Sequence, residues 1–278
     1  MKRHDGARCK MVVRVLVLAV GALCGFTMAA SALAAEEKPA AALSVDVLSQ
    51  YIFRGFALSE DSVVIQPAIS VDYMGFEAEL WGNVDTNRDS AAAGNHLNSW
   101  TETEATLAYS HAFGPVEVTG GFIYYAFDDP AIDDAEEFFA KLALPDLPLA
   151  PTLTAYREVA HKPSWYIALE VSQDFALAHG MSLELGARAA YLISNDRDEF
   201  PEIDDHGVIH GKFNDFDDGR VSAALSIPVT EYVTVRPEVF WSFPLSSDAE
   251  SLIRDAGLSV TTDSASYVYG GIGAVMRF

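Results

Sequence analysis

The chain has 278 residues, of which half are apolar, and 40 acidic against 18 basic residues give it a formal net charge of −22. This charge excludes a nucleic-acid-binding protein, because the phosphate backbone requires a basic surface. The apolar and aromatic content is too high for a disordered chain. Both an acidic soluble protein and an unusual membrane protein fit these totals, so the order of the residues must decide between them.

Residues 1–35 predict a cleaved signal peptide. Basic residues precede an apolar run at 15–26, and the tripeptide A-L-A at 32–34 offers small residues for cleavage. An uncleaved membrane anchor is the alternative, and the small residues favour cleavage. The expected mature chain, 36–278, is a single domain with a net charge of −26. It has no cysteine, and therefore neither disulfides nor thiol chemistry.

From about residue 42 onward, apolar residues alternate with polar or small ones. Leu43 and Val45 share one face, for example, and Ser44 and Asp46 share the other. A period of two is the signal of a β-strand, because successive side chains point to opposite faces. The alternation predicts twelve strands, at about residues 43–54, 63–73, 76–85, 100–113, 116–127, 136–144, 152–159, 165–177, 182–193, 220–229, 233–243 and 267–278.

The connections between these strands alternate in length. Tight turns are expected at 74–75, 114–115, 177–181 and 230–232. Longer polar loops are expected at 86–99, 128–135, 195–219 and 244–266, the last with one short helix near 248–257. An even number of strands with short turns at one end and long loops at the other is typical of bacterial outer-membrane barrels. We therefore predict an all-β fold: an antiparallel transmembrane β-barrel with short periplasmic turns and longer extracellular loops.

The placement of aromatic residues separates this barrel from a soluble β-sandwich, whose apolar face would point inward. One group clusters by the short turns (Tyr73, Phe76, Tyr109, Phe113, Phe175 and Tyr232) and another near the loops (Tyr51, Phe53, Tyr124, Trp165, Tyr191, Trp241 and Phe243). Two girdles around an aliphatic band suit two lipid–water interfaces. The expected location is the bacterial outer membrane, with lipid and lipopolysaccharide as surroundings.

The final strand alternates up to Phe278. This ending resembles the C-terminal signature of outer-membrane proteins, which implies recognition by the barrel-assembly machinery. Further resemblance lies in the sequence S-Q-Y-I-F-R-G at 49–55, the strand at 64–73, L-W-G-N at 80–83 and F-I-Y-Y at 122–125. These stretches resemble the opening of the TorF family of porins, over about residues 45–127. The resemblance implies an outer-membrane barrel with a channel role and supplies no functional residues.

If the apolar face meets lipid, the polar face lines the lumen. Strands one to five then offer an acidic wall: Asp46, Asp72, Glu77, Glu79, Glu102, Glu104 and Glu117. Strands nine to twelve, with strand one beside them on closure, offer a basic ladder: Arg54, Arg188, Arg220, Arg236 and Arg277.

Two interpretations of this lumen remain open. One is a narrow water-filled channel for passive diffusion of small polar solutes. It would prefer cations, because lumen carboxylates outnumber basic groups. The other is a closed lumen braced by Arg–carboxylate pairs, in a structural or partner-binding barrel without conductance. Twelve strands fall between small filled barrels of about eight and open porins of about sixteen.

Other chemistry finds little support. The acidic stretches 195–199 and 214–219 hold closely spaced oxygen ligands, but neither completes a calcium loop, so we expect solvated outer loops and no metal. The sequence has no G-x-S-x-G and no H-E-x-x-H, and we expect neither an enzyme nor a cofactor. No lipid-facing strand is unusually polar, which favours a monomer.

Overall fold

The computed structural model describes residues 38–278, except 61, 91–94, 130–131, 205 and 262–263. The predicted signal peptide lies outside these residues and stays a prediction. Within the described part of the chain, no helix has the length and hydropathy to cross a membrane.

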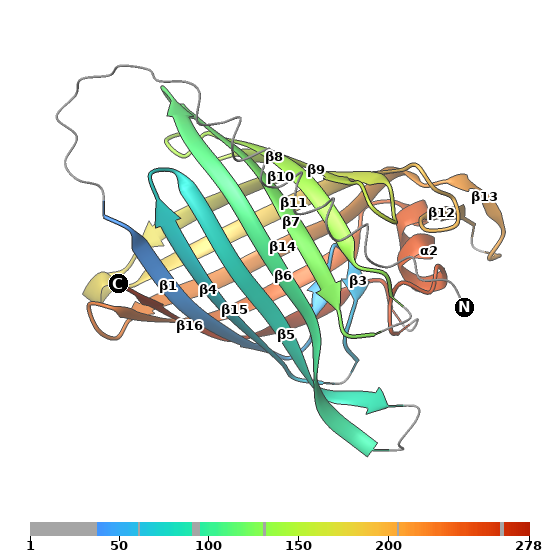
Figure 1. Ribbon diagram of the computed structural model, residues 1–278, viewed down its shortest axis with the longest axis horizontal. Helices are drawn as coiled ribbons and strands as arrows, with labels where there is room; N and C mark the ends of the chain where they lie inside the picture. Colours follow the sequence, from blue (N-terminus) through green and yellow to red (C-terminus); the bar gives the residue numbers. More distant parts are fainter. Residues whose placement is uncertain (1–37, 61, 91–94, 130–131, 205, 262–263) are drawn as a thin grey trace, which may run out of the picture. The chain divides into compact units, whose positions relative to one another are not determined.

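Twelve antiparallel strands close into one barrel (Figure 1). They are β1 (Ala40–Leu48), β4 (Val64–Tyr73), β5 (Phe76–Ser90), β6 (Asn95–Phe113), β7 (Val116–Phe127), β8 (Ala135–Ala143), β9 (Thr152–Glu158), β10 (Ser164–Ala176), β11 (Ser182–Ser194), β14 (Asn214–Pro228), β15 (Val233–Pro244) and β16 (Tyr267–Arg277). Each strand pairs with its neighbours in sequence, and β16 pairs with β1 to close the sheet. The predicted fold class and strand number are confirmed.

The turns follow from backbone chemistry at one end of the barrel. Tyr73 pairs directly with Phe76, so Met74-Gly75 is a two-residue turn, and both of its residues have positive φ, 52° and 83°. This is the type I′ geometry whose twist matches a hairpin. A 3₁₀ turn, η1 (Ala178–Gly180), joins β10 to β11 at the same end. We refer to this end as the turn side and to the other as the loop side.

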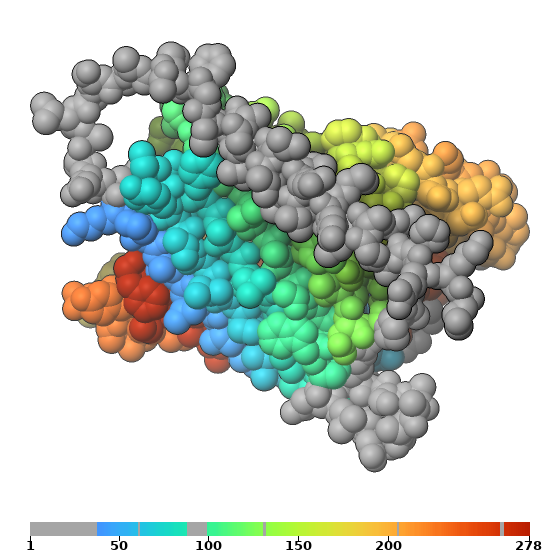
Figure 2. Space-filling model, viewed as in Figure 1, coloured from blue at the N-terminus to red at the C-terminus, as the bar shows by residue number. Residues whose placement is uncertain are grey.

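The outer surface is apolar. Large exposed side chains on the strands include Val45, Ile69, Leu80, Leu107 and Val239, and Figure 2 shows the outer layer over β1, β4 and β5. Exposed aromatic residues lie at the turn side and the loop side, among them Tyr73, Phe76, Tyr109, Phe113, Phe175 and Tyr232 at the first and Tyr124, Trp165 and Trp241 at the second. An apolar exterior is stable only in lipid, so this surface is that of a membrane barrel.

The connection between β1 and β4 departs from the prediction. Strand β1 ends at Leu48, and the chain then forms a small hairpin of β2 (Ile52–Phe53) and β3 (Phe56–Ala57), which lies inside the barrel (Figure 1). We call residues 49–60 the inner hairpin segment. The alternation had placed Tyr51, Phe53 and Arg54 on strand one. Tyr51 and Phe53 therefore do not belong to the lipid-facing girdle, because the chain turns inward before it reaches them.

The loop side carries the remaining elements. Helix α2 (Ser247–Asp255) begins at Ser246, whose hydroxyl accepts a hydrogen bond from the Ala249 backbone N–H at 3.1 Å. A second small hairpin pairs β12 (Pro201–Ile203) with β13 (Ile209–Lys212). The buried Leu252 and Ile253 of α2 join a core cluster with Phe56 of the inner hairpin segment and with inward residues of β10, β11 and β16. The predicted helix is thus confirmed, and it covers the inner hairpin segment.

Candidate functional site

The site is built around Arg54, at the tip of the inner hairpin segment. Phe53 pairs with Phe56, so Arg54-Gly55 is a two-residue turn with φ of 48° and 87°, again the type I′ geometry. A non-glycine residue in this region is strained, and it persists where its surroundings hold it. A Cβ on Gly55 would lie 3.0 Å from the Cβ of Asp218. The tip is therefore pressed against β14.

The guanidinium of Arg54 is clamped. It donates two hydrogen bonds of 2.7 Å to the two carboxylate oxygens of Glu137 on β8. It also lies 4.4 Å from the ring centre of Tyr166 and 4.7 Å from that of Tyr156. Bidentate pairing and aromatic stacking both suit the planar charge of arginine. Only 15% of the side chain is exposed, so this pair crosses the lumen as a rigid brace.

A second contact holds the base of the inner hairpin segment. The hydroxyl of Tyr51 donates to Glu102 on β6 at 3.1 Å, and its ring packs against Trp81 at 5.7 Å. The backbone N–H of Tyr51 donates to the hydroxyl of Ser59 at 2.8 Å. The segment is thus tied to β5, β6, β8 and β14. These strands belong to different parts of the wall, so the segment narrows the loop side of the lumen.

The acidic stretch at 214–219 is not a solvated outer loop, and that prediction was wrong. These residues form the start of β14, and the side chains of Asp217 and Asp218 are fully buried. The register between β11 and β14 shifts at this point, and such a bulge sets two residues opposite one. Asp218 accepts hydrogen bonds from the hydroxyl of Tyr166 at 2.5 Å and from the guanidinium of Arg188.

The basic ladder is placed in part as the sequence suggested. Arg188, Arg220 and Arg236 alternate with lipid-facing neighbours on β11, β14 and β15 and point into the lumen. Arg54 is not part of this ladder, because it sits on the inner hairpin segment. Arg277 is exposed at the turn side.

Ion pairs on the turn side are more open to water. Arg236 contacts Glu184 at 3.1 Å and Glu238 at 3.4 Å. Arg220 contacts Glu170 at 3.8 Å, with 31% and 41% of the two side chains exposed. A hollow of about 230 Å³ lies beside these groups and is lined by Glu170, Glu184, Arg188 and Arg220.

The acidic wall lies on the opposite strands. Asp46, Glu77, Glu79, Glu102 and Glu104 occupy the positions that alternate with exposed apolar residues. Glu102 is buried. Asp72 is exposed near a tight turn, and Glu117 follows another, so these two residues lie at the turn-side rim. Within the described residues, no ion pair engages Glu77, Glu79 or Glu104.

The sequence reasoning missed several residues that organise the lumen: Tyr125, Glu137, Glu158, Tyr166, Asp217 and Asp218. Glu137 faces inward by the parity of its strand, a signal that was available. The two aspartates offered no such signal, because a bulge breaks the alternation that would have shown them.

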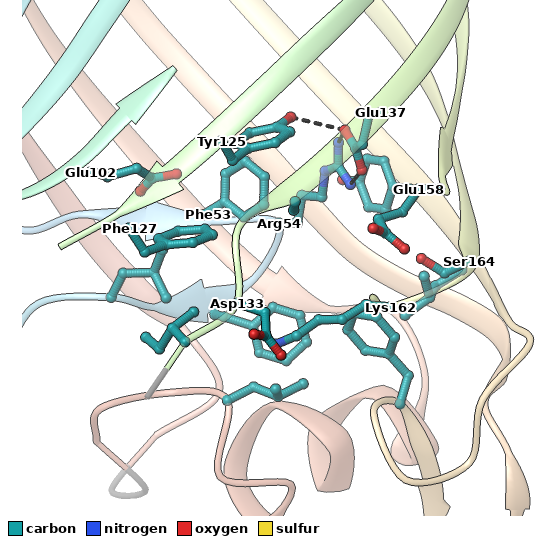
Figure 3. A pocket seen from close by; sticks show the side chains of 18 of the residues that line it. Phe53, Arg54, Glu102, Tyr125, Phe127, Asp133, Glu137, Glu158, Lys162 and Ser164 are labelled. Atoms are coloured by element: carbon teal, nitrogen blue, oxygen red, sulfur yellow. Dashed lines mark hydrogen bonds and ion pairs between the residues drawn. The ribbon is translucent and has the colours of Figure 1, made fainter. Parts of the chain in front are cut away.

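A pocket of about 190 Å³ lies at the loop side, against the inner hairpin segment (Figure 3). Its walls include Phe53, Tyr125 and Phe127, with Glu137 and Glu158 on another side. Across the described part of the chain, no group of three or more His, Cys, Asp or Glu side chains is arranged to hold a metal ion.

No family model and no curated protein matches the sequence. Solved structures do match the fold. A NanC porin aligns over 85% of this chain and 100% of its own, with 11% identity and a TM-score of 0.56. OmpT of Vibrio cholerae aligns over 90% of this chain and all of its own, with 9% identity and a TM-score of 0.39. An anion-selective porin from Comamonas acidovorans covers 87% of this chain and 99% of its own, at 8% identity and a TM-score of 0.36.

The closed barrel, its apolar exterior and its charged interior define the class as a porin-like outer-membrane β-barrel. The likeness to the NanC porin rests on the fold, and the resemblance to the TorF family finds no support beyond the stretches of sequence that suggested it.

Proposed function

We propose that this barrel is a narrow outer-membrane channel for passive diffusion of small polar solutes, with a preference for cations. One observation supports it above the others. The lumen arginines 54, 188, 220 and 236 are each paired with a carboxylate, whereas Glu77, Glu79 and Glu104 have no ion pair within the described residues. The lumen therefore holds carboxyl groups in excess of its arginines, and a ring or wall of carboxylates attracts cations.

The arrangement of charge also supports a transverse field. The acidic wall lies on β1, β4, β5, β6 and β7, and the paired arginines 188, 220 and 236 lie on β11, β14 and β15. A polar solute would cross between the two. The inner hairpin segment would set the upper limit on its size, because it occupies the loop side of the lumen.

A second candidate function is a closed structural or partner-binding barrel. It is favoured by the clamp on Arg54, which spans the lumen with two short hydrogen bonds and stacks on two rings. Recording from planar bilayers separates the two candidates. A protein that migrates as a heat-modifiable barrel on gels yet gives no channel steps is the closed barrel.

The ion preference is tested by the reversal potential in a potassium chloride gradient. We expect the sign that marks cation permeation, and a shift toward zero in the double variant Glu79→Gln, Glu104→Gln. Glu231→Gln is the matched control, because this exposed carboxylate sits in a tight turn outside the lumen. A reversal potential that favours anions in the unmodified protein contradicts the proposal. Liposome swelling with sugars, amino acids and nucleosides of graded size would then identify the class of solute.

We also propose the surroundings that the barrel requires. The side chain of Phe278 is exposed beside β1, where its backbone pairs with Ala41, and a terminal aromatic at this edge would present the last strand to the assembly machinery. The apolar exterior would contact lipid and lipopolysaccharide. Its continuity favours a monomer.

A further inference from the structure

The loop-side pocket contains more carboxylates than cations to pair with them. Glu137 and Glu158 face each other across β8 and β9, and both are buried. Like charges directly opposite on neighbouring strands destabilise a sheet unless they are compensated. Arg54 compensates Glu137 with both of its terminal nitrogens. For Glu158, one oxygen accepts from the backbone N–H groups of Ala160 and His161, and the buried Oε2 has no hydrogen-bond partner among the described residues.

Strand β14 also carries more buried carboxylates than it has partners for. Asp217 and Asp218 are neighbours at the bulge of β14, and both are fully buried. Arg188 and Tyr166 engage Asp218. Neither carboxylate oxygen of Asp217 has a hydrogen-bond partner within the described residues. A buried carboxylate without a donor is costly, so each of these two groups suits a ligand that supplies one.

Glu158 and Asp217 line one and the same pocket, and the rest of that pocket is largely apolar. Its other walls come from aromatic and aliphatic side chains: Phe53, Phe56, Leu58, Tyr125, Phe127, Ile132, Leu192, Phe200 and Leu258. The two basic residues in the lining are already engaged, Arg54 by Glu137 and Lys162 by Glu199 at 3.5 Å. Figure 3 shows Glu158 beside Ser164, with Phe53, Phe127 and Tyr125 across the pocket.

We infer that this pocket binds a small organic cation, an ammonium group on an apolar or aromatic body. The ammonium would donate to Glu158 and Asp217, and the body would pack on the aromatic walls, which also attract cations. An anion would meet uncompensated carboxylates. A neutral sugar would leave most of its hydroxyls facing apolar side chains, at a cost for each. The pocket volume of about 190 Å³ limits the ligand to a small molecule. The site does not depend on whether the lumen conducts.

The test is isothermal titration calorimetry on the full barrel refolded in detergent, with a micelle-only blank. Three probes share one aromatic body: 2-phenylethylammonium, 2-phenylethanol and 3-phenylpropionate. We expect saturable binding of the ammonium and at least about tenfold weaker binding of the alcohol and the carboxylate, since a hydrogen bond that involves a charged group is stronger than one between neutral groups. Equal binding of the alcohol and the ammonium overturns the proposal, and this comparison needs no variant.

Variants then locate the site. Glu158→Gln and Asp217→Asn keep the shape of each side chain and remove its charge, and we expect each to weaken ammonium binding by about tenfold. Glu231→Gln, at the turn side, leaves it unchanged. Unchanged affinity in both Glu158→Gln and Asp217→Asn, with each variant shown to be heat-modifiable on gels, overturns the assignment. If Asp217→Asn fails to refold, Glu158→Gln and the three probes decide the question.

Discussion

Both halves of the lumen contain arginine–glutamate ion pairs, and these pairs differ in how deeply they are buried. On the loop side, Arg54 pairs with Glu137 at 2.7 Å, with 15% and 6% of the side chains exposed. On the turn side, Arg220 and Glu170 lie 3.8 Å apart, with 31% and 41% of the side chains exposed. The first pair is a fixed brace, because its partners cannot be replaced by water without cost. The second is screened by solvent and contributes little. The more buried ion pair and the more hydrated ion pair thus lie in opposite halves of one barrel.

The largest effect is expected from deletion of the inner hairpin segment, which removes Arg54 and with it the buried ion pair of the loop side. Leu48 and Val64 are direct partners across β1 and β4, so Asn-Gly in place of residues 49–63 would close a two-residue turn. We expect single-channel conductance in planar bilayers to rise by at least about threefold, because only wall side chains then line the lumen. The matched control replaces Met74-Gly75 with Asn-Gly at the other end. Unchanged conductance in the deletion variant would mean that the constriction lies elsewhere.

Neutralising one carboxylate in each half of the lumen compares how much the two ion pairs contribute to stability. Glu137→Gln leaves Arg54 buried without its charged partner, and we expect a loss of about 3 kcal/mol in the free energy of unfolding. Glu170→Gln on the turn side should cost less than about 1 kcal/mol, since its pair is partly exposed. Urea unfolding of both variants in lipid vesicles supplies the values. Equal losses would show that the two halves do not differ in this way.

The helix that covers the inner hairpin segment offers a smaller effect. Ser246→Ala removes the hydroxyl that caps α2, and we expect a loss of about 1 kcal/mol in the stability of the helix. Hydrogen exchange of the α2 backbone measures it. Ser247→Ala is the matched control, because Ser247 is exposed and its hydroxyl lies 3.5 Å from Asp248. A similar loss in both variants would argue against the capping role.

The smallest effect is expected outside the barrel, at the β12–β13 hairpin. His210 and Asp204 share a hydrogen bond of 2.7 Å, which raises the pKa of His210 above 6.5 and, with backbone N–H donors, lowers the pKa of Asp204 to about 2. The histidine contribution is complete below pH 6.5 and is lost as the pH rises through its raised pKa. The aspartate contribution is present above pH 3.8 and is lost as the pH falls toward 2.

Both contributions are therefore present between about pH 4 and 6.5. We expect His210→Gln to lower the melting temperature slightly at pH 5 and to have less effect at pH 9. In a nuclear magnetic resonance titration, Asp204→Asn should move the pKa of His210 back toward 6.5. An unmoved value would show that this pair does not hold the hairpin.

The strands were predictable because a membrane barrel must alternate at every step. Leu43 to Val47 and Val233 to Val239 alternate in this way, so strand number, faces and tight turns followed from period two alone. The inner hairpin segment was not found because its residues preserve the same alternation. Its available signal was Arg54-Gly55 between two phenylalanines, which has the chemistry of a two-residue turn.

The candidate site was less predictable than the fold. The inward placement of Arg188, Arg220 and Arg236 follows from parity, but their partners depend on register across several strands. Asp217 and Asp218 look like a hydrated loop in the sequence, and only the bulge in β14 buries them. A bulge adds one residue to a strand and cannot be recognised from composition. The burial of these two aspartates therefore depends on strand pairing that the sequence does not reveal.

The seam between β1 and β16 joins distant parts of the chain. Ala42 pairs with Arg277, and the backbone of Ala41 exchanges two hydrogen bonds with that of Phe278. These partners lie at opposite ends of the described chain, so the pairing that closes the barrel spans a greater sequence separation than any other strand pairing among the described residues. Contacts within neighbouring hairpins are local, whereas the seam joins residues that are far apart in sequence, and such long-range contacts are slow to form. Until then both edge strands are unpaired, and the nascent barrel is exposed to wrong pairing with other chains.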